Sequence, residues 1–310
     1  MSQPPGMGNY LQFETGTTCN ADCTFCMHGC MKRHGIMPLT KIIDLTYHLA
    51  HKAHVICPFH MQEPLLDSRI DKICSNVKVF NPKSKVWVYT NMSLYPQKQL
   101  ENIVKWGLVD GLIVSLYGRS PEQHNSMQRG IDYEACCENL KRFRKMRDGF
   151  GYSLPEIRVG YLVTKETMHG IKQFMQDWHG IADETVFFRY DGWCGNLPYD
   201  PDFEAKLWGP PAPRVPCKEL WAGPTVHFDG TLVPCCMDYD DSMPLGNIFK
   251  DWTLWEKGVE INKLRRLHTE GRWDEVAMCR NCTKWRYNHE KEWIEYWLRM
   301  KKSVVCAVKS

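Results

Sequence analysis

The sequence has almost no net charge and contains no long apolar run. Its 39 Lys and Arg residues nearly balance 36 Asp and Glu residues, and the net charge of +3 excludes a polybasic nucleic-acid binder. Its strongly apolar stretches, such as Gly111–Tyr117, are shorter than the roughly 18 residues that cross a bilayer. Residues 1–9 also lack the basic start and apolar core of a secretory signal. We therefore expect a cytoplasmic protein that binds neither nucleic acid nor a membrane.

Cysteine, in contrast, is abundant. The chain has 15 cysteines in 310 residues. Because a chain of this length is too long to be a small disulfide scaffold, this density of cysteine indicates metal or redox chemistry. The odd number also argues against a complete set of intramolecular disulfides. In a reducing cytoplasm these thiols are free to bind metal.

Short β-rich runs alternate with amphipathic runs through the first two-thirds of the chain. This alternation predicts a parallel sheet covered by helices, curled by right-handed crossovers into a barrel with a site at the carboxyl ends of its strands. The expected strands are Tyr10–Glu14, His54–Phe59, Val86–Thr90, Gly111–Leu116, Ile157–Val163 and Thr185–Tyr190. The expected helices are Leu39–His51, Leu66–Asn76, Gln97–Trp106, Tyr133–Arg147 and Gly170–Trp178.

The alternation ends after Asp191. The proline-rich stretch at 208–216 (WGPPAPRVP) is hostile to regular structure and predicts a boundary between a domain of residues 1–207 and one of residues 208–310. Beyond it the pattern predicts a hairpin and two helices: Thr225–Phe228 and Thr231–Pro234 around Asp229-Gly230, then Thr253–Leu267, then Trp285–Val305 packed against the barrel.

The first cysteine set follows the first expected strand directly. Cys19, Cys23 and Cys26 form C-x3-C-x2-C. Three thiolates on one loop can hold three corners of a [4Fe–4S] cube, which leaves the fourth iron open to a substrate or cofactor. A zinc loop, or thiols without metal, is the alternative interpretation of this triplet alone.

A second set lies in the C-terminal third. Cys217 precedes the expected hairpin and Cys235 directly follows its second strand, while Cys279 and Cys282 form a C-x2-C. Four thiolates suit either tetrahedral zinc or a fully ligated [4Fe–4S] cluster, and spacing does not decide between the two metals.

The first triplet, with Phe25 before its last cysteine, resembles the signature of the radical S-adenosylmethionine (radical SAM) superfamily. The run from Cys217 to Phe249, followed by Cys279–Cys282, resembles the SPASM/twitch domains of such enzymes. Because only Cys306 follows Cys282, the resemblance is to the shorter twitch form with one auxiliary cluster. It spans Tyr10 to Cys282 and implies an α/β fold: a partial (β/α)6 TIM-like barrel with a small C-terminal α+β twitch domain and a C-terminal helix.

The same resemblance implies contacts to S-adenosylmethionine. The G-G-E-P stretch of family members corresponds to His60–Pro64 (HMQEP), which keeps Glu-Pro and replaces both glycines. Ser115 and Arg129 correspond to residues that reach the methionine carboxylate, for which a hydroxyl and a guanidinium fork are suited. A turn serine and a surface arginine are the alternative interpretations. The implied cofactor-binding residues are Phe25, Met61, Gln62, Glu63, Asn91, Ser115 and Arg129.

The resemblance also implies the chemistry. The cofactors would be S-adenosylmethionine and two [4Fe–4S] clusters, one SAM-binding and one auxiliary, with an electron donor such as flavodoxin or ferredoxin. Reductive cleavage yields a 5′-deoxyadenosyl radical that removes a C–H hydrogen from the substrate, while the protein positions and shields the reactants. Loss of an electron to a fully ligated auxiliary cluster then gives oxidation, whereas return of a hydrogen atom from a thiol gives epimerisation.

Candidate catalytic residues follow the sixth expected strand. Arg189 would hold a polar substrate group or a developing alkoxide, Asp191 would act as a base, and Cys194 or Cys236 would donate a hydrogen atom. Packing or surface ion pairing is the alternative for each of them. The cysteines interpreted as small hydrophobic core residues are Cys57, Cys74, Cys136 and Cys137.

Three functions fit these observations. We favour a radical SAM enzyme that oxidises or epimerises a polar small molecule such as a sugar or aminocyclitol, because nothing resembling a leader-peptide recognition domain precedes Tyr10 or follows the twitch region. A maturase that epimerises, oxidises or crosslinks a ribosomally made peptide is the first alternative. A non-enzymatic zinc or electron-transfer protein is the second, and iron and sulfide analysis after anaerobic reconstitution would distinguish it.

Overall fold

The computed structural model describes residues 8–210 and 213–287, and it divides the chain into two compact units. The first unit, here called the barrel unit, comprises Tyr10–Tyr190 together with Val226–Gly230. The second, here called the cysteine-rich unit, holds the remaining described residues. The predicted domain boundary at residues 207 and 208 stays a prediction. Most of the helix expected at Trp285–Val305 lies outside the described residues, as does Cys306.

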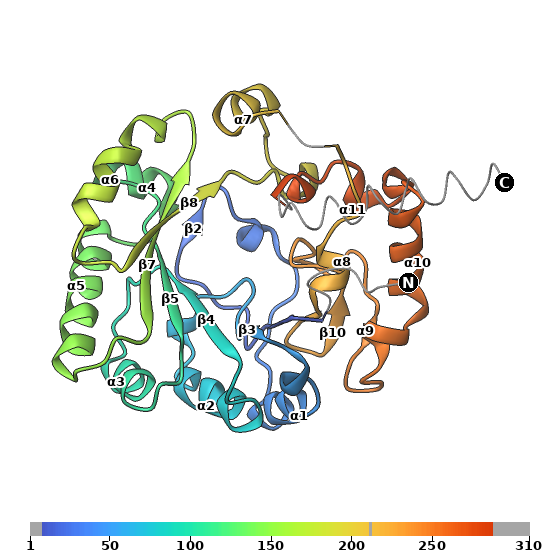
Figure 1. The fold of residues 1–310 in the computed structure, drawn as a ribbon, viewed down its shortest axis with the longest axis horizontal. Coiled ribbons are helices and arrows are strands. Elements are labelled where there is room, and N and C mark those ends of the chain that lie inside the picture. The colour runs from blue at the N-terminus through green and yellow to red at the C-terminus, as the bar shows by residue number, and fades with distance from the viewer. Residues whose placement is uncertain (1–7, 211–212, 288–310) are drawn as a thin grey trace. The chain divides into compact units, whose positions relative to one another are not determined.

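The barrel unit is built on a parallel sheet whose strands follow one another in the order β1-β3-β4-β5-β7-β8 (Figure 1). These strands are β1 (Tyr10–Phe13), β3 (Val55–Cys57), β4 (Lys85–Thr90), β5 (Gly111–Ser115), β7 (Glu156–Val163) and β8 (Glu184–Arg189). The helices between them are α1 (Leu39–Leu49), α2 (Ile70–Phe80), α3 (Gln97–Lys105), α4 (Pro121–Met127), α5 (Tyr133–Gly149) and α6 (Ile171–Trp178). The predicted α/β fold class and partial barrel are confirmed.

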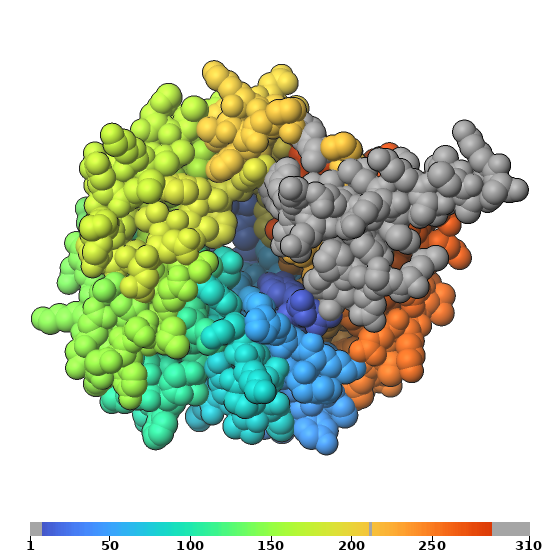
Figure 2. Space-filling model, in the orientation of Figure 1, coloured from blue at the N-terminus to red at the C-terminus, as the bar shows by residue number. Residues whose placement is uncertain are grey.

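The composition of the strands explains why they lie inside. Every residue of β5 is buried, as expected for a parallel strand that is covered on both faces. Gly111 at its start lets the indole ring of Trp87 lie against the backbone, because a Cβ at this position would be 2.3 Å from that ring. On the outer side of the unit, the side chains of α1, α2, α3 and α5 form a continuous surface (Figure 2).

Two aspartates anchor the strands at their amino ends. The Asp110 carboxylate, just before β5, accepts a hydrogen bond from the backbone N–H of Val86 on β4 at 2.8 Å and pairs with Lys78 at 2.6 Å. In the same way, Asp183, just before β8, accepts from the N–H of Ile157 on β7 at 2.8 Å. These contacts fix strand register at the end opposite to the carboxyl ends of the strands, which leaves those ends free to carry function.

The cysteine-rich unit mixes short strands and helices. In it, β10 (Thr231–Val233) pairs antiparallel with β11 (Gly246–Asn247), and Arg265 Nε donates to the carbonyl of Leu220 at 2.9 Å, which ties α10 to α8. The helices of this unit are α7 (Pro201–Trp208), α8 (Glu219–Ala222), α9 (Leu254–Lys257), α10 (Val259–Thr269) and α11 (Ala277–Arg280). β9 (Thr225–Val226) leads into Val226–Gly230 of the barrel unit. This segment holds the predicted turn, in which Gly230 N–H donates to the carbonyl of His227 at 2.9 Å.

Several predicted elements differ from those observed. The helix expected at Leu66–Asn76 begins instead at Ile70, because Pro64–Leu66 form a separate 3-10 turn capped by the preceding carboxylate. The helix expected at Thr253–Leu267 is two helices, since the backbone is extended at Gly258 (φ −57°, ψ 141°). Further elements carry no clear pattern in the sequence and were not predicted: α4, α7 and the pair of two-residue strands β2 (Asp22–Cys23) and β6 (Gln128–Arg129).

Three of the four cysteines predicted to lie in the core do so. Cys57, Cys74 and Cys136 are buried, whereas Cys137 is half-buried on α5 and was wrongly assigned to the core. Every cysteine in residues 8–210 and 213–287 is free of disulfide bonds. None of the helices in these ranges is long and apolar enough to span a bilayer.

The buried His124 of α4 makes the stability of the fold depend on pH. Its side chain is 0% exposed, and burial lowers the pKa of His124 to about 4. Because the unfolded chain then binds the proton first, stability is full above pH 6.5 and falls as the pH drops towards 4. We expect a loss of up to about 1.4 kcal/mol per pH unit in this window. His124→Asn should show a smaller loss in anaerobic denaturation experiments between pH 7.5 and 5; equal slopes would contradict this.

Candidate functional site

The loop with the first three cysteines is held by a short antiparallel pair. Strands β2 and β6 place Asp22 opposite Arg129 and Cys23 opposite Gln128. The N–H of Thr24 also donates to the carbonyl of Met127 at 2.9 Å. A segment that follows β5 therefore shapes the cysteine loop that follows β1.

The three thiols of this loop are half-buried and close enough to repel one another as thiolates. Burial, followed by the charges of Cys26 and Cys19, raises the pKa of Cys23. The backbone N–H of His28 donates to the Cys26 sulfur at 3.4 Å, and the Gln128 side chain hydrogen-bonds Cys23. Donors aimed at sulfur and a need for compensating positive charge fit an iron–sulfur cluster.

The spacing of these thiols also bears on the kind of metal site. Within the described ranges, no three His, Cys, Asp or Glu side chains are grouped as ligands of one metal ion. In a [4Fe–4S] cube each thiolate binds a different iron, so its thiols need not converge on one point. The arrangement is therefore compatible with three corners of a cube.

Glu63 is buried beside this loop and connects it to the barrel strands. Its side chain is 4% exposed and accepts hydrogen bonds from Thr90 Oγ1 at 2.5 Å, the N–H of Asn91 at 2.8 Å and the N–H of Leu65 at 3.1 Å. Burial raises the pKa of Glu63, and these three hydrogen bonds oppose that effect. The backbone N–H of Glu63 donates to the carbonyl of Thr18, immediately before Cys19, at 3.0 Å.

Asn91 makes the second connection. Its Nδ2 donates to Asn20 Oδ1, inside the cysteine loop, at 3.0 Å, while its own Oδ1 accepts from Ser93. Asn20 in turn donates to the Ser93 hydroxyl at 2.8 Å. The predicted cofactor residues Glu63 and Asn91 thus come together and hold the cysteine loop through their own hydrogen bonds.

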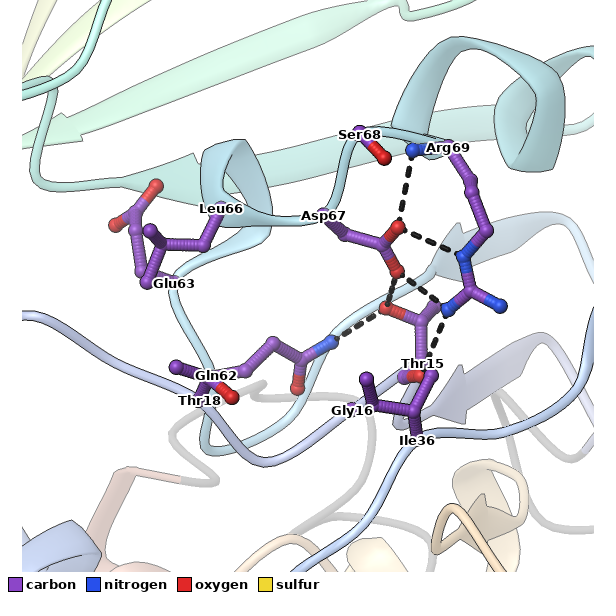
Figure 3. A pocket seen from close by; sticks show the side chains of 10 residues that line it. All are labelled: Thr15, Gly16, Thr18, Ile36, Gln62, Glu63, Leu66, Asp67, Ser68 and Arg69. Atoms are coloured by element: carbon purple, nitrogen blue, oxygen red, sulfur yellow. Dashed lines mark hydrogen bonds and ion pairs between the residues drawn. The ribbon is translucent and has the colours of Figure 1, made fainter.

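A pocket of about 240 Å³ opens next to Glu63 in the barrel unit (Figure 3). Gln62 Nε2 donates to Thr15 Oγ1 at 3.0 Å, and Thr15 in turn donates to the Asp67 carboxylate at 2.9 Å. Asp67 is paired with Arg69 at 2.8 Å. The predicted residue Met61 is buried. This polar wall is suited to a ligand with hydrogen-bonding groups.

The other predicted cofactor residues lie around Tyr117. The Ser115 hydroxyl at the end of β5 is hydrogen-bonded to Tyr117, whose ring contacts Phe25 edge-to-face at 5.1 Å. Tyr117 has a φ of 53° and its pKa is raised by burial and by nearby Cys23. Tyr117 was not predicted as a site residue, because a positive φ leaves no mark in the residue pattern. Arg129 is 56% exposed and pairs with Asp22 at 2.6 Å.

The four predicted auxiliary ligands lie around one small cavity of the cysteine-rich unit. Its volume is about 20 Å³. The cysteines that line it are Cys194, Cys217, Cys235, Cys279 and Cys282. Four thiols from three separate segments fit a cluster bound entirely by cysteine, whereas the fifth, Cys194, is a candidate hydrogen-atom donor.

Polar groups support this cavity from outside. The N–H of Cys217 donates to His268 Nδ1 at 3.2 Å, and burial lowers the pKa of His268 to about 4, which keeps the ring neutral as an acceptor. Arg214 donates to the carbonyl of Cys279 at 2.7 Å. The N–H of Lys284 donates to the Cys282 sulfur at 3.3 Å, as expected for a thiolate that binds metal.

The structure places three of the predicted catalytic residues in the cysteine-rich unit. The Asp191 carboxylate accepts from the N–H of Trp193 at 2.8 Å, and burial raises its pKa. Asp191, Cys236 and the ammonium group of Lys284 lie within electrostatic range of one another. Sequence reasoning missed Lys284, whose position two residues after Cys282 was the available signal. Arg189 ends β8 in the barrel unit.

Removal of the Glu63 carboxylate should release the cysteine loop. Glu63→Ala leaves three donors without an acceptor in a buried site, and we expect the free energy of unfolding to fall by about 3 kcal/mol or more. Glu63→Gln keeps one acceptor oxygen and should lose about 1–2 kcal/mol. Anaerobic denaturation with iron analysis measures both effects, and Glu138→Ala on the exposed face of α5 is the control. Equal stability of all three variants would refute the role of Glu63.

Comparisons with solved structures show the same fold. The chain resembles BtrN in complex with AdoMet and 2-DOIA, with 18% identity, a TM-score of 0.61, and coverage of 91% of this chain and 94% of BtrN. Streptococcus suis SuiB bound to S-adenosylmethionine is 14% identical with a TM-score of 0.67, and the match covers 91% of this chain and 72% of SuiB. The structure of anSMEcpe with bound AdoMet is 16% identical with a TM-score of 0.62, and the match covers 96% of this chain and 99% of anSMEcpe. No curated protein sequence matches the chain.

Two protein-family models match the chain and show its family. The profile of the radical SAM superfamily matches residues 13–177, which is more than half of the chain. A profile of an iron-sulfur cluster-binding domain, SPASM, matches residues 217–283. The cofactors are accordingly S-adenosylmethionine with a [4Fe–4S] cluster, and an auxiliary iron–sulfur cluster. The chain belongs to the radical SAM superfamily and is a radical SAM enzyme with a C-terminal SPASM/twitch domain.

Proposed function

We propose that this enzyme removes hydrogen from a carbon of a polar small molecule, such as a sugar or aminocyclitol, and oxidises it. The observation that carries the proposal is that Cys217, Cys235, Cys279 and Cys282, the four proposed ligands, line one small cavity of the cysteine-rich unit. A cluster bound by four thiolates has no open iron, so it offers no coordination position to a substrate. Its suitable role is therefore to accept an electron from the substrate.

The residues of the chain have separate tasks in this proposal. When bound, S-adenosylmethionine and its cluster supply the radical that takes the hydrogen atom, and the auxiliary cluster takes up the electron. Cys19, Cys23 and Cys26 hold the first cluster, and Glu63 keeps their loop in place through Thr18 and Asn91. Asp191 accepts the proton that leaves the oxidised carbon centre, and Arg189 holds a polar group of the substrate.

The proposed contacts to S-adenosylmethionine lie in three places of the barrel unit. Gln62 and Glu63 face the 240 Å³ pocket, whose hydrogen-bonding wall suits the amino-acid end of S-adenosylmethionine. Ser115 and Phe25 are grouped with Tyr117 beside the cysteine loop. Arg129 pairs with Asp22 and would exchange this partner for the methionine carboxylate, as a guanidinium fork allows. A flavodoxin or ferredoxin is the proposed electron donor.

A small-molecule substrate is supported by the comparison with BtrN. That structure contains 2-DOIA, and the present chain covers 94% of it. A peptide substrate is the alternative, because anSMEcpe has been solved with the Cp18Cys peptide and is covered over 99% of its length. Epimerisation is the alternative outcome for a small molecule, since the Cys194 and Cys236 thiols lie beside the auxiliary site and can return a hydrogen atom.

Reaction in heavy water should distinguish these outcomes. The reconstituted enzyme, reduced with dithionite, is incubated in D2O with 2-DOIA and a panel of aminocyclitols and sugars. We expect a product that has lost two hydrogens and carries no deuterium on carbon. Deuterium on an inverted carbon would establish epimerisation and refute oxidation. Turnover of a short peptide, with none of the panel consumed, would refute the small-molecule proposal.

Loss of an auxiliary ligand should separate radical formation from product formation. In Cys235→Ala the first cluster is untouched, so we expect 5′-deoxyadenosine to form while product formation is lost. Cys137→Ala, which changes a half-buried cysteine of α5, is the matched control and should keep both. Chromatography of 5′-deoxyadenosine and product in parallel assays measures the two yields. Full product formation by Cys235→Ala would show that the auxiliary cluster is dispensable.

A further inference from the structure

The auxiliary cavity contains one thiol more than a [4Fe–4S] cluster can bind. Five cysteines line it, and a cube with one thiolate per iron uses four. The additional thiol, Cys194, comes from the 3-10 turn Trp193–Gly195, and its sulfur hydrogen-bonds the sulfur of Cys282. The Cys194 thiol therefore lies where a ligand of the auxiliary cluster would lie, next to the thiol of Cys282.

The backbone of this turn is strained in a way that delivers Cys194 to the cavity. Trp193, Cys194 and Gly195 all have positive φ, at 43°, 59° and 92°. A non-glycine residue persists in this region only when the surrounding structure imposes it, and such residues cluster at functional sites. The constraint here is local: the Asp191 carboxylate accepts from the N–H of Trp193 at 2.8 Å.

The turn is also pressed against the loop that carries Cys282. A Cβ on Gly195 would lie 2.9 Å from the Cβ of Asn281, the residue before Cys282. Glycine at this position permits an approach that other residues would prevent. Two independent features, a left-handed turn and a close glycine contact, thus hold the Cys194 thiol next to Cys282.

We propose that Cys194 is an alternative ligand of the auxiliary cluster and exchanges with Cys282. In the exchange the bond from iron to the Cys282 sulfur breaks and one to the Cys194 sulfur forms. The proton of the Cys194 thiol passes to the Cys282 thiolate along their hydrogen bond, so charge and electron count are unchanged. This inference rests on the proposed assignment of the auxiliary ligands. It does not depend on which substrate is oxidised.

The test uses variants that carry only the auxiliary cluster. In full-length protein with Cys19, Cys23 and Cys26 all replaced by alanine, iron and sulfide are measured per chain after anaerobic reconstitution, with electron paramagnetic resonance of the reduced state. Cys282→Ala should keep about four irons per chain, with an altered spectrum, because Cys194 supplies the fourth thiolate. Cys194→Ala should also keep them, through Cys282. The double variant should lose the cluster.

Cys279→Ala is the matched control, since Cys194 hydrogen-bonds Cys282 and not Cys279, and this variant should lose the cluster. The proposal is overturned if Cys282→Ala loses iron as completely as Cys279→Ala, or if the double variant keeps as much iron as Cys282→Ala. Loss of iron from Cys194→Ala alone would make Cys194 an obligatory ligand and also overturn exchange. Because no substrate is present, failure to detect an oxidised product in the earlier assay leaves these outcomes unaffected.

Discussion

The buried carboxylate of Glu63 is the contact on which the first cluster site depends. One side chain that is 4% exposed accepts three hydrogen bonds, from the start of its own turn and from the end of β4. A carboxylate in such a place is stable only while its donors stay in position, so it fixes Thr90, Asn91 and Leu65 together. Through Asn91 and Thr18 the same constraint reaches both sides of Cys19.

The two cysteine sites solve different physical problems. The first is a half-buried loop that leaves one corner of a cube for a cofactor, and side-chain and backbone donors such as Gln128 and His28 face its sulfurs. The second is a small cavity formed by segments far apart in the sequence, with buried His268 and half-buried Arg214 hydrogen-bonded to the backbone of its cysteines. An open site suits binding and bond cleavage, whereas a closed one suits electron transfer.

Much of the fold could be predicted from the sequence, and so could the presence of two cysteine sets. Strands such as β5 are recognisable because every residue is apolar or small, and cysteine spacing singles out both sets of candidate ligands. The pairing of β2 with β6 could not be predicted, since two-residue strands have no periodicity. The position of Cys194 in the auxiliary cavity depends on three positive φ angles, which only the surrounding structure imposes.

The pairing of β2 with β6 has a consequence for how the enzyme matures. Cys23 lies opposite Gln128 in this pair, although about a hundred residues separate them in the chain. During synthesis the cysteine loop leaves the ribosome long before its pairing partner, so its contacts with β6 become available only after those made through Glu63 and Asn91. The full set of contacts around the first cysteine site is therefore complete only once the chain has been made past β5, the fourth parallel strand.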